Sequence, residues 1–310
     1  MFYLVCRKVR WQLLMHDTVR QKDRFEQRLS DKHGLSNKLM QNEVNQMKFT
    51  KMHGLGNDYL YVYGEVPENI AELSGKLSER HFGAGSDGMI YISKSNVADF
   101  KMRIFNADGS EAKMCGNGIR CVGKFVYDKG YTDKKFLSIE TLSGVKYLTL
   151  HVVGGKVKTV TVDMGQAKAE KPMDLTVDGE TVSLIPVSVG NPHAVIFIDD
   201  IKTAPLTTLG PKIEHHPNFP DGVNVEFVEV LGADKLRMRV WERGSGVTMA
   251  CGTGACASVM AAIATKHCHY DETVSVVLDG GILKIKIASD NTVQMTGPAE
   301  TIYEGETEIC

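Results

Sequence analysis

The chain has little net charge, no long apolar run and an odd number of cysteines, and each of these shortages excludes a class of protein. A formal net charge of −2 over 310 residues gives no reason to expect nucleic acid or anionic lipid as the main partner. No apolar run approaches the roughly 18–20 residues that a membrane-spanning helix needs. Seven cysteines cannot all pair within one chain, and no secretory signal with a clean apolar run is present. The sequence therefore predicts a cytoplasmic protein with free thiols.

Two kinds of cofactor site are also missing from the sequence. No lysine stands in a motif that suggests a pyridoxal Schiff base, and no metal-ligand spacing is present. Cys121 and Cys256 follow Cys115 and Cys251 along predicted helices, which is not the arrangement of a structural zinc site. We expect no metal and no organic cofactor, and we interpret Cys121 and Cys256 as packing residues.

What the sequence does contain is one pattern written twice. The first copy reads Asn106-Ala-Asp-Gly-Ser-Glu-Ala-Lys-Met-Cys115-Gly-Asn-Gly118, and the second reads Glu242-Arg-Gly-Ser-Gly-Val-Thr-Met-Ala-Cys251-Gly-Thr-Gly254. Upstream, Gly56-Asn57 matches Gly190-Asn191 and Asp87-Gly88 matches Asp221-Gly222, in the same order and at nearly equal spacing. A repeat of this length indicates two homologous domains of roughly 130 residues. If they face each other, two equivalent cysteines meet in one cleft, a layout that suits proton transfer between the two faces of a carbon.

Beyond Met47, alternating apolar and polar residues predict an α+β protein rich in antiparallel strands. Helices are expected over 67–80, 116–129 and 252–265, because apolar residues recur there at helical spacing. Strands are expected at 48–52, 58–62, 100–104, 194–198, 223–230, 236–241, 274–287 and 292–295, with a meander over 136–164 that turns at Gly154-Gly155. Each half therefore places a long helix against a curved, mostly antiparallel sheet.

Cys-Gly-x-Gly at the start of a helix has a chemical purpose. The first backbone N–H groups of a helix lack internal partners, and the helix dipole adds positive charge there. Glycine lets a carboxylate approach those N–H groups closely. The same field is expected to lower the pKa of the thiol toward neutrality. One thiolate could then remove an α-proton while the opposite thiol returns a proton to the other face.

At this point the chain resembles the diaminopimelate epimerases. The resemblance rests on His53-Gly-Leu-Gly-Asn-Asp58, on Met114-Cys-Gly-Asn-Gly-Ile-Arg-Cys121 and on the motif from Glu242 to Ala255, and it runs from Met47 to the end. It implies two similar domains related by a pseudo-twofold axis, residues 47–165 (completed by 298–310) and 166–297. It also implies an isomerase that converts LL- to meso-diaminopimelate without pyridoxal phosphate, in lysine and peptidoglycan biosynthesis. A homodimer whose only other partner is this small molecule is expected.

The resemblance also assigns residues. Cys115 and Cys251 match the two acid/bases of the family, and His193 and Glu242 match positions that support catalysis. The substrate-binding positions fall on Asn57, Asn106, Gly116, Asn117, Asn191, Asn224, Glu242, Arg243, Gly252 and Thr253. Arg243 can grip a distal carboxylate bidentately, and Glu242 can accept from an ammonium. One departure is Gly88, where many relatives carry a glutamine that touches substrate.

Plainer readings of these residues stay open. Asn57 and Asn191 follow glycine, which is common in turns. Arg243 beside an acid could be a solvated strand residue, and His193 could be structural. A proline or hydroxyproline racemase would also use two cysteines, but with Cys-Gly-His-Gly in its first motif. An isomerase of unsaturated acids is a further alternative. A non-enzymatic binding protein of the same fold should have lost at least one thiol, whereas both are present here.

Residues 1–46 lie outside the repeat. They carry nine Lys or Arg against five Asp or Glu, too many acids for a transit peptide. We expect a disordered N-terminal extension before a second start at Met47.

Overall fold

The computed structural model describes residues 45–309. The N-terminal extension up to residue 44, for which we predict disorder, lies outside the described residues. Gln46–Cys310 is one of the two units into which the chain divides. No helix in this described part is long and apolar enough to cross a membrane.

The first half of the unit, residues 45–166, places a three-turn helix beside a mixed sheet. Its elements are β1 (Asn45–Gly54), β2 (Asn57–Tyr63), α1 (Ile70–Ser78), β3 (Gly88–Ser93), β4 (Phe100–Asn106), β5 (Glu111–Ala112), α2 (Gly116–Asp128), β6 (Phe136–Thr141), β7 (Gly144–Val153) and β8 (Lys156–Gln166). β1 pairs antiparallel with β2, β2 pairs parallel with β3, and β3 pairs antiparallel with β4. β4 then pairs parallel with β6, which continues antiparallel through β7 to β8.

The second half, residues 168–298, repeats this order. Its elements are β9 (Lys168–Ala169), β10 (Met173–Val177), β11 (Glu180–Ser188), β12 (Pro192–Phe197), η2 (Ile201–Thr203), α3 (Leu206–Glu214), β13 (Asn224–Gly232), β14 (Lys235–Glu242), β15 (Gly246–Val247), α4 (Gly252–Ala264), β16 (Thr273–Leu278), β17 (Gly281–Ile287) and β18 (Thr292–Pro298). The pairings β11–β12, β12–β13, β13–β14, β14–β16, β16–β17 and β17–β18 copy the first half in direction as well as order. The predicted α+β class is confirmed, because each half combines a mostly antiparallel sheet with a few helices.

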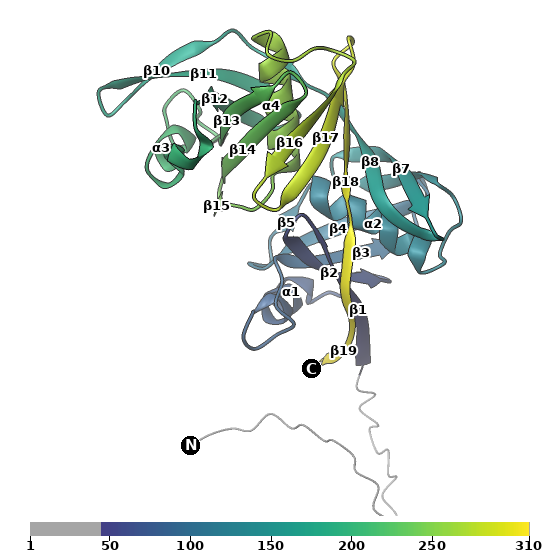
Figure 1. Cartoon of the computed structure of the whole chain (residues 1–310). Helices are drawn as coiled ribbons and strands as arrows, with labels where there is room; N and C mark the ends of the chain where they lie inside the picture. The colour runs from purple at the N-terminus through teal and green to yellow at the C-terminus, as the bar shows by residue number, and fades with distance from the viewer. Residues whose placement is uncertain (1–44, 310) are drawn as a thin grey trace, which may run out of the picture. The chain divides into compact units, whose positions relative to one another are not determined.

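One ladder joins the two halves. β8 and β18 run antiparallel, with Gln166 opposite Thr292 and Thr159 opposite Pro298, and they lie side by side in Figure 1. After β18 the chain continues as β19 (Glu300–Ile309), which pairs with β1 in the first half. The predicted domain boundaries at 165/166 and 297/298 stay a prediction.

The helices α2 and α4 are the centre of the packing. On α2, Ile119, Val122 and Val126 are fully buried, and α4 is almost entirely buried because its residues are small and apolar. A Cβ at Gly123 would come within 2.8 Å of Leu150, so this glycine lets α2 rest directly on the sheet. Side chains of both helices belong to one hydrophobic cluster. The starts of the two helices are thereby held by a common core.

Candidate active site

Each of the two repeated cysteines caps the start of a helix. Cys115 precedes α2 in an extended conformation (φ −137°), and its Sγ accepts a hydrogen bond from the Gly118 N–H at 3.3 Å. Cys251 precedes α4 in the same conformation (φ −113°), and its Sγ accepts from the Gly254 N–H at 3.4 Å. Each sulfur accepts the capping hydrogen bond that a serine or aspartate side chain usually accepts at a helix start. The equal geometry places both thiols in the positive field of a helix start.

The Cys115 side of the site is built from the end of β1 and the start of β2. The thiol donates to Asn57 Oδ1 at 3.3 Å, and Asn57 Nδ2 donates to Asp87 Oδ2 at 2.7 Å. Asn57 is therefore brought to the thiol and oriented by a carboxylate behind it. Its place after Gly56, which has φ +87°, is a turn position as well, so the two readings of this residue hold together.

The Cys251 side carries more charge. The buried ring of His193 makes a 2.7 Å hydrogen bond through Nδ1 to Glu226 Oε1, and its Nε2 lies 3.0 Å from Asn191 Oδ1. Asn191 Nδ2 donates to Thr253 Oγ1 at 3.3 Å, and that hydroxyl lies 3.6 Å from Cys251 Sγ. These contacts form a continuous polar chain from a buried carboxylate to the second thiol.

The expected lowering of the thiol pKa is wrong for this structure. Burial raises the pKa of Cys115, although the N–H groups of Gly118 and Asn117 lower it. Burial raises the pKa of Cys251 still further, and the carboxylates of Glu242 and Glu226 add to the rise. The helix field acts in the expected direction, but desolvation of the thiolate outweighs it.

The carboxylate of Glu242 acts electrostatically on both cysteines. Its charge raises the pKa of both Cys115 and Cys251. Burial raises its own pKa, while hydrogen bonds from Thr248 and Cys251 lower it. Thr248 Oγ1 donates to Glu242 Oε1 and fixes the carboxylate.

The two helix starts meet. Asn117 Nδ2 donates to the carbonyl of Ala250, the residue before Cys251, at 3.0 Å. A Cβ built on Gly252 would lie 3.8 Å from the Cα of Gly116. The side chain of Asn117 is thus committed within the protein, so a ligand at Gly116, Asn117, Gly252 and Thr253 would be held by backbone N–H groups.

The other predicted binding residues are placed less directly. Asn224 is buried. Its Nδ2 donates to the Pro192 carbonyl (2.9 Å), and its Oδ1 accepts from the Arg243 N–H (3.1 Å). The Arg243 side chain is exposed and donates to the Asp221 carbonyl at 2.8 Å. Asn106 donates to Ser110 Oγ at 3.1 Å. Asn224 therefore orients the segment that carries Arg243, whose exposed guanidinium is held by the Asp221 carbonyl.

A side chain at Gly88 would clash with the neighbouring strand in this backbone. Its φ is +155°, and a Cβ would lie 2.1 Å from the Phe105 carbonyl oxygen across the β3–β4 pair. A glutamine, which the resemblance implies for many relatives, would not fit this local strand geometry.

Glu226 was not among the predicted residues. It is fully buried, and its Oε2 has no hydrogen-bond partner in the described part of the chain. A sequence signal was available, because Glu226 stands two residues after Asn224 in a strand and so shares its face. An acid between apolar neighbours in an inward-facing strand position calls for a partner, which is His193.

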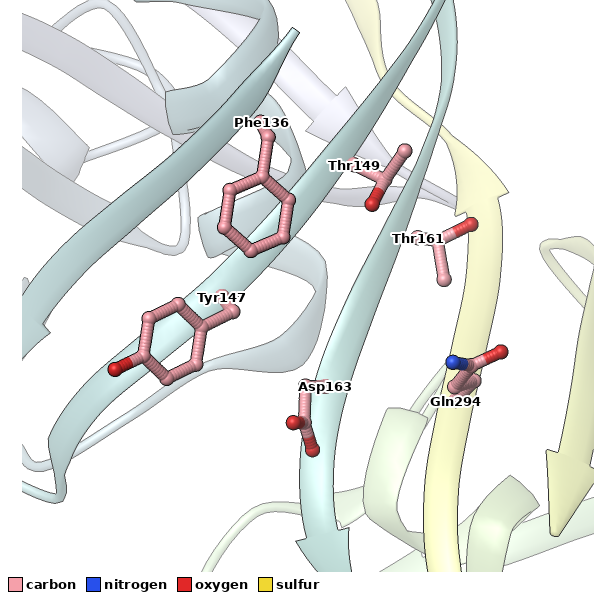
Figure 2. Close-up of a pocket in the computed structure, with 6 residues that line it drawn as sticks. All are labelled: Phe136, Tyr147, Thr149, Thr161, Asp163 and Gln294. Carbon is pink, nitrogen blue, oxygen red and sulfur yellow. The ribbon is translucent and has the colours of Figure 1, made fainter. Parts of the chain in front are cut away.

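The hollow drawn in Figure 2 is a different place. Its lining residues come from β6, β7, β8 and β18 and include the stacked rings of Phe136 and Tyr147 together with Asp163 and Gln294. It holds neither repeated cysteine, so the candidate site follows from the polar clusters and not from this hollow. No group of three or more His, Cys, Asp or Glu side chains within residues 45–309 could hold a metal ion.

Comparisons with known proteins agree with these observations. The family model described as diaminopimelate epimerase matches residues 49–170 and 185–302. A diaminopimelate epimerase of Acetivibrio thermocellus is 50% identical over 279 residues, covering 85% of this chain and 99% of the relative. One of Methanococcus maripaludis strain C5 is 51% identical over 279 residues, covering 85% of this chain and all of the relative (100%).

Solved structures share the fold at low sequence identity. A hydroxyproline epimerase from Agrobacterium vitis matches with a TM-score of 0.62 at 16% identity, covering 85% of this chain and 93% of that one. A Bacillus anthracis phenazine biosynthesis protein of the PhzF family matches with a TM-score of 0.67 at 15% identity, covering 85% and 99%. These likenesses show the fold alone, whereas the family model and the relatives at half identity show the family. The chain belongs to the diaminopimelate epimerase family.

Proposed function

We propose that this protein is an isomerase that converts LL-2,6-diaminopimelate to the meso form, with Cys115 and Cys251 as the two acid/bases. The observation that carries the proposal is the pair of matched cysteine caps, each bound by a first-turn N–H. Two-base inversion needs one proton acceptor and one proton donor on opposite faces of the same carbon. The reaction belongs to the biosynthesis of lysine and of peptidoglycan precursors.

The substrate's reacting carboxylate would be bound by the backbone N–H groups at Gly116, Asn117, Gly252 and Thr253. Removal of the α-proton leaves an electron pair on the carbon, and its charge spreads into that carboxylate. Donors that already point at the carboxylate stabilise the charge as it develops. This is why the proposed chemistry requires no pyridoxal phosphate and no metal.

Proton transfer then balances across the site. The Cys115 thiolate takes the α-proton as the C–H bond breaks, and the Cys251 thiol gives its proton to the opposite face, ending as a thiolate. The reverse direction exchanges the two roles. Glu242 would bind the reacting ammonium, and the cation would offset the carboxylate charge that now raises the pKa of both thiols.

His193 and Glu226 would act behind Cys251. The histidine holds Asn191 through a 3.0 Å contact, and Asn191 in turn contacts Thr253. Asn57 plays the matching part beside Cys115. At the far end of the substrate, Arg243 would pair with the distal carboxylate, with Asn106 and Asn224 near it. We further propose a cytoplasmic homodimer.

The decisive experiment is incubation with LL-diaminopimelate in deuterium oxide. The expected result is meso product with deuterium at the inverted α-carbon, without added cofactor. A racemase for proline or hydroxyproline would instead label those amino acids. The absence of any α-deuterium in diaminopimelate would refute the proposed function.

A further inference from the structure

Arg120 is a fully buried arginine without an acidic partner. Its side chain is 0% exposed, and no Asp or Glu among residues 45–309 forms an ion pair with it. Its nitrogens donate instead to the carbonyls of Pro298 (3.1 Å) and Gly116 (2.9 Å) and to Asn117 Oδ1 (3.0 Å). A buried charge is costly unless it is paired, so an arginine kept without an acid needs a reason.

The protein makes room for this guanidinium with two glycines. A Cβ at Gly54 would lie 2.9 Å from one terminal nitrogen of Arg120, and a Cβ at Gly297 would lie 3.0 Å from its Nε. Gly54 ends β1 in the first half, and Gly297 lies near the end of β18 in the second half. The slot that holds the guanidinium is therefore formed by both halves of the unit. The space for the guanidinium is therefore set by backbone at these two glycines, with Asn117 Oδ1 as a side-chain acceptor.

The slot lies directly behind the two helix starts. Gly116, which accepts from Arg120, follows Cys115 in the chain, and Asn117 leads on to the carbonyl of Ala250 before Cys251. The charge of Arg120 is among the influences that lower the pKa of Cys115. In the second half the equivalent position, five residues after the cysteine, is Cys256. The charge of Arg120 also lowers the pKa of Cys256, so its field reaches both helices.

We infer that Arg120 is the fixed counter-ion of the active site, stabilising the anions that the reaction places at the two helix starts. These anions are the Cys115 thiolate and the substrate carboxylate that takes up the charge of the carbanion. The inference rests on the proposed function. It explains why no acid accompanies the arginine, because a permanent carboxylate would cancel the field that the reaction uses. Arg120 is a positioning residue, since it acts through Gly116 and Asn117.

The test compares charge with shape at one position. Arg120→Lys keeps the charge and loses the planar fork, whereas Arg120→Gln loses the charge and keeps a donor. The matched control is Lys124→Met, one turn further along α2, which removes a buried cation paired with Asp128 at 2.8 Å. Alkylation of each cysteine by iodoacetamide is followed across pH by peptide mass mapping, which requires no turnover and so tests Arg120 even if diaminopimelate is not the substrate.

We expect Arg120→Gln to move the Cys115 profile to higher pH, with alkylation on the order of tenfold slower at a fixed pH below the midpoint. Arg120→Lys should stay within about twofold of the parent, Lys124→Met should leave the profile unchanged, and Cys251 should shift less than Cys115. An unchanged profile in Arg120→Gln, or equal losses in the Gln and Lys variants, would show that Arg120 is only a structural tie. If the Gln variant fails to fold, the Lys variant alone decides. Alkylation of Cys115 that is about tenfold slower in Arg120→Lys than in the parent would overturn the inference, because the charge is still present.

Discussion

Cys115 and Cys251 have the same cap geometry but different electrostatic surroundings. Arg120 lowers the pKa of the first cysteine and Glu226 raises the pKa of the second, whereas Glu242 raises both. The side chains that approach the two capping glycines differ in the same way. A Cβ built on Gly118 would lie 2.7 Å from the apolar side chain of Ile90, whereas a Cβ built on Gly254 would lie 2.7 Å from the carboxylate of Glu226. The two thiols are therefore inequivalent, and Cys115 is the one whose thiolate the structure opposes less.

Replacing either cysteine with alanine should abolish epimerisation, because each face of the carbon needs its own acid/base. A positioned acid/base typically supplies about 10²–10⁴-fold, so kcat should fall by at least that range in Cys115→Ala and in Cys251→Ala. Initial rates of meso formation measure this, with Cys121→Ala as a buried control. Retention of more than about a tenth of kcat in either variant would remove the two-base assignment.

Removing the charge of Glu242 should make both thiols ionise at lower pH. Its carboxylate raises the pKa of Cys115 and of Cys251, so Glu242→Gln takes away an unfavourable interaction with each thiolate. The measurement is the pH profile of iodoacetamide alkylation, which should move to lower pH even though kcat falls. Glu229→Gln, in the neighbouring strand β13 but bonded to the Ile201 N–H, is the control. A profile that moves to higher pH would contradict this electrostatic assignment.

Arg243 is expected to set the specificity for a second carboxylate. A site built to pair a polar group rejects analogues that lack it, because its own donors are left unsatisfied. Lysine should then be a very poor substrate, and Arg243→Met should lower kcat/KM for diaminopimelate by on the order of 10²-fold or more. Slow α-proton exchange should persist, because the thiols are untouched.

The control for this variant is Arg239→Met, on β14 just before Arg243 but paired with Asp279 at 3.0 Å. If Arg243→Met still prefers diaminopimelate over lysine, the distal anchor lies elsewhere, with Asn106 and Asn224 the next residues to change.

At the scale of elements, the sequence predicted best where a local pattern decides the structure. The helices expected over 116–129 and 252–265 are α2 (Gly116–Asp128) and α4 (Gly252–Ala264), because a cap, glycines and a helical apolar period agree there. The turn at Gly154-Gly155 joins β7 to β8 with positive φ at both residues, 60° and 75°, as a two-residue hairpin turn requires.

Prediction failed where a local rule was overridden by tertiary contacts. α3 contains Pro211, which argues against a helix, yet Leu206, Gly210 and Ile213 are buried against the sheet. The hairpin β10–β11 was not predicted either, and Pro186, a residue that argues against a strand, lies within its second strand. The same limit applies to the site, since spacing along the chain revealed the cysteines but not the pairing of Glu226 with His193 across two strands.

Restoring the family's glutamine at Gly88 should weaken the β3–β4 pairing. A Cβ there would sit 2.1 Å from the Phe105 carbonyl oxygen, so the strands must shift and a cost of about 1–3 kcal/mol is expected. Thermal unfolding of Gly88→Gln and Gly88→Ala measures this, and both should lose a similar amount because the Cβ causes the clash. If the alanine variant keeps the parent Tm, the backbone adjusts there and the strain argument fails.

At the scale of the whole molecule, the meeting of two halves at one site predicts a redox response. Two thiols that act on one carbon must lie close enough to bond directly when no substrate separates them. Mild oxidation should therefore form a Cys115–Cys251 cross-link and stop activity, and dithiothreitol should reverse both.

Peptide mapping identifies the linked pair, and added diaminopimelate should protect against it. Cys121 and Cys256 are fully buried and should remain as free thiols. A bond between Cys115 and Cys121 would mean that the two helix starts do not face each other as proposed.

The hydrophobic clusters also determine how the site is lost. The side chains packed around α1 and those packed around α3 form clusters of their own, while α2 and α4 share the central one. Cooperative opening follows such units, so the outer helices can fray and exchange their amides while both caps survive. Opening of the central cluster releases Cys115 and Cys251 in a single event. Because an enzyme with one thiol inverts nothing, a core that keeps or loses both together leaves no half-active population behind.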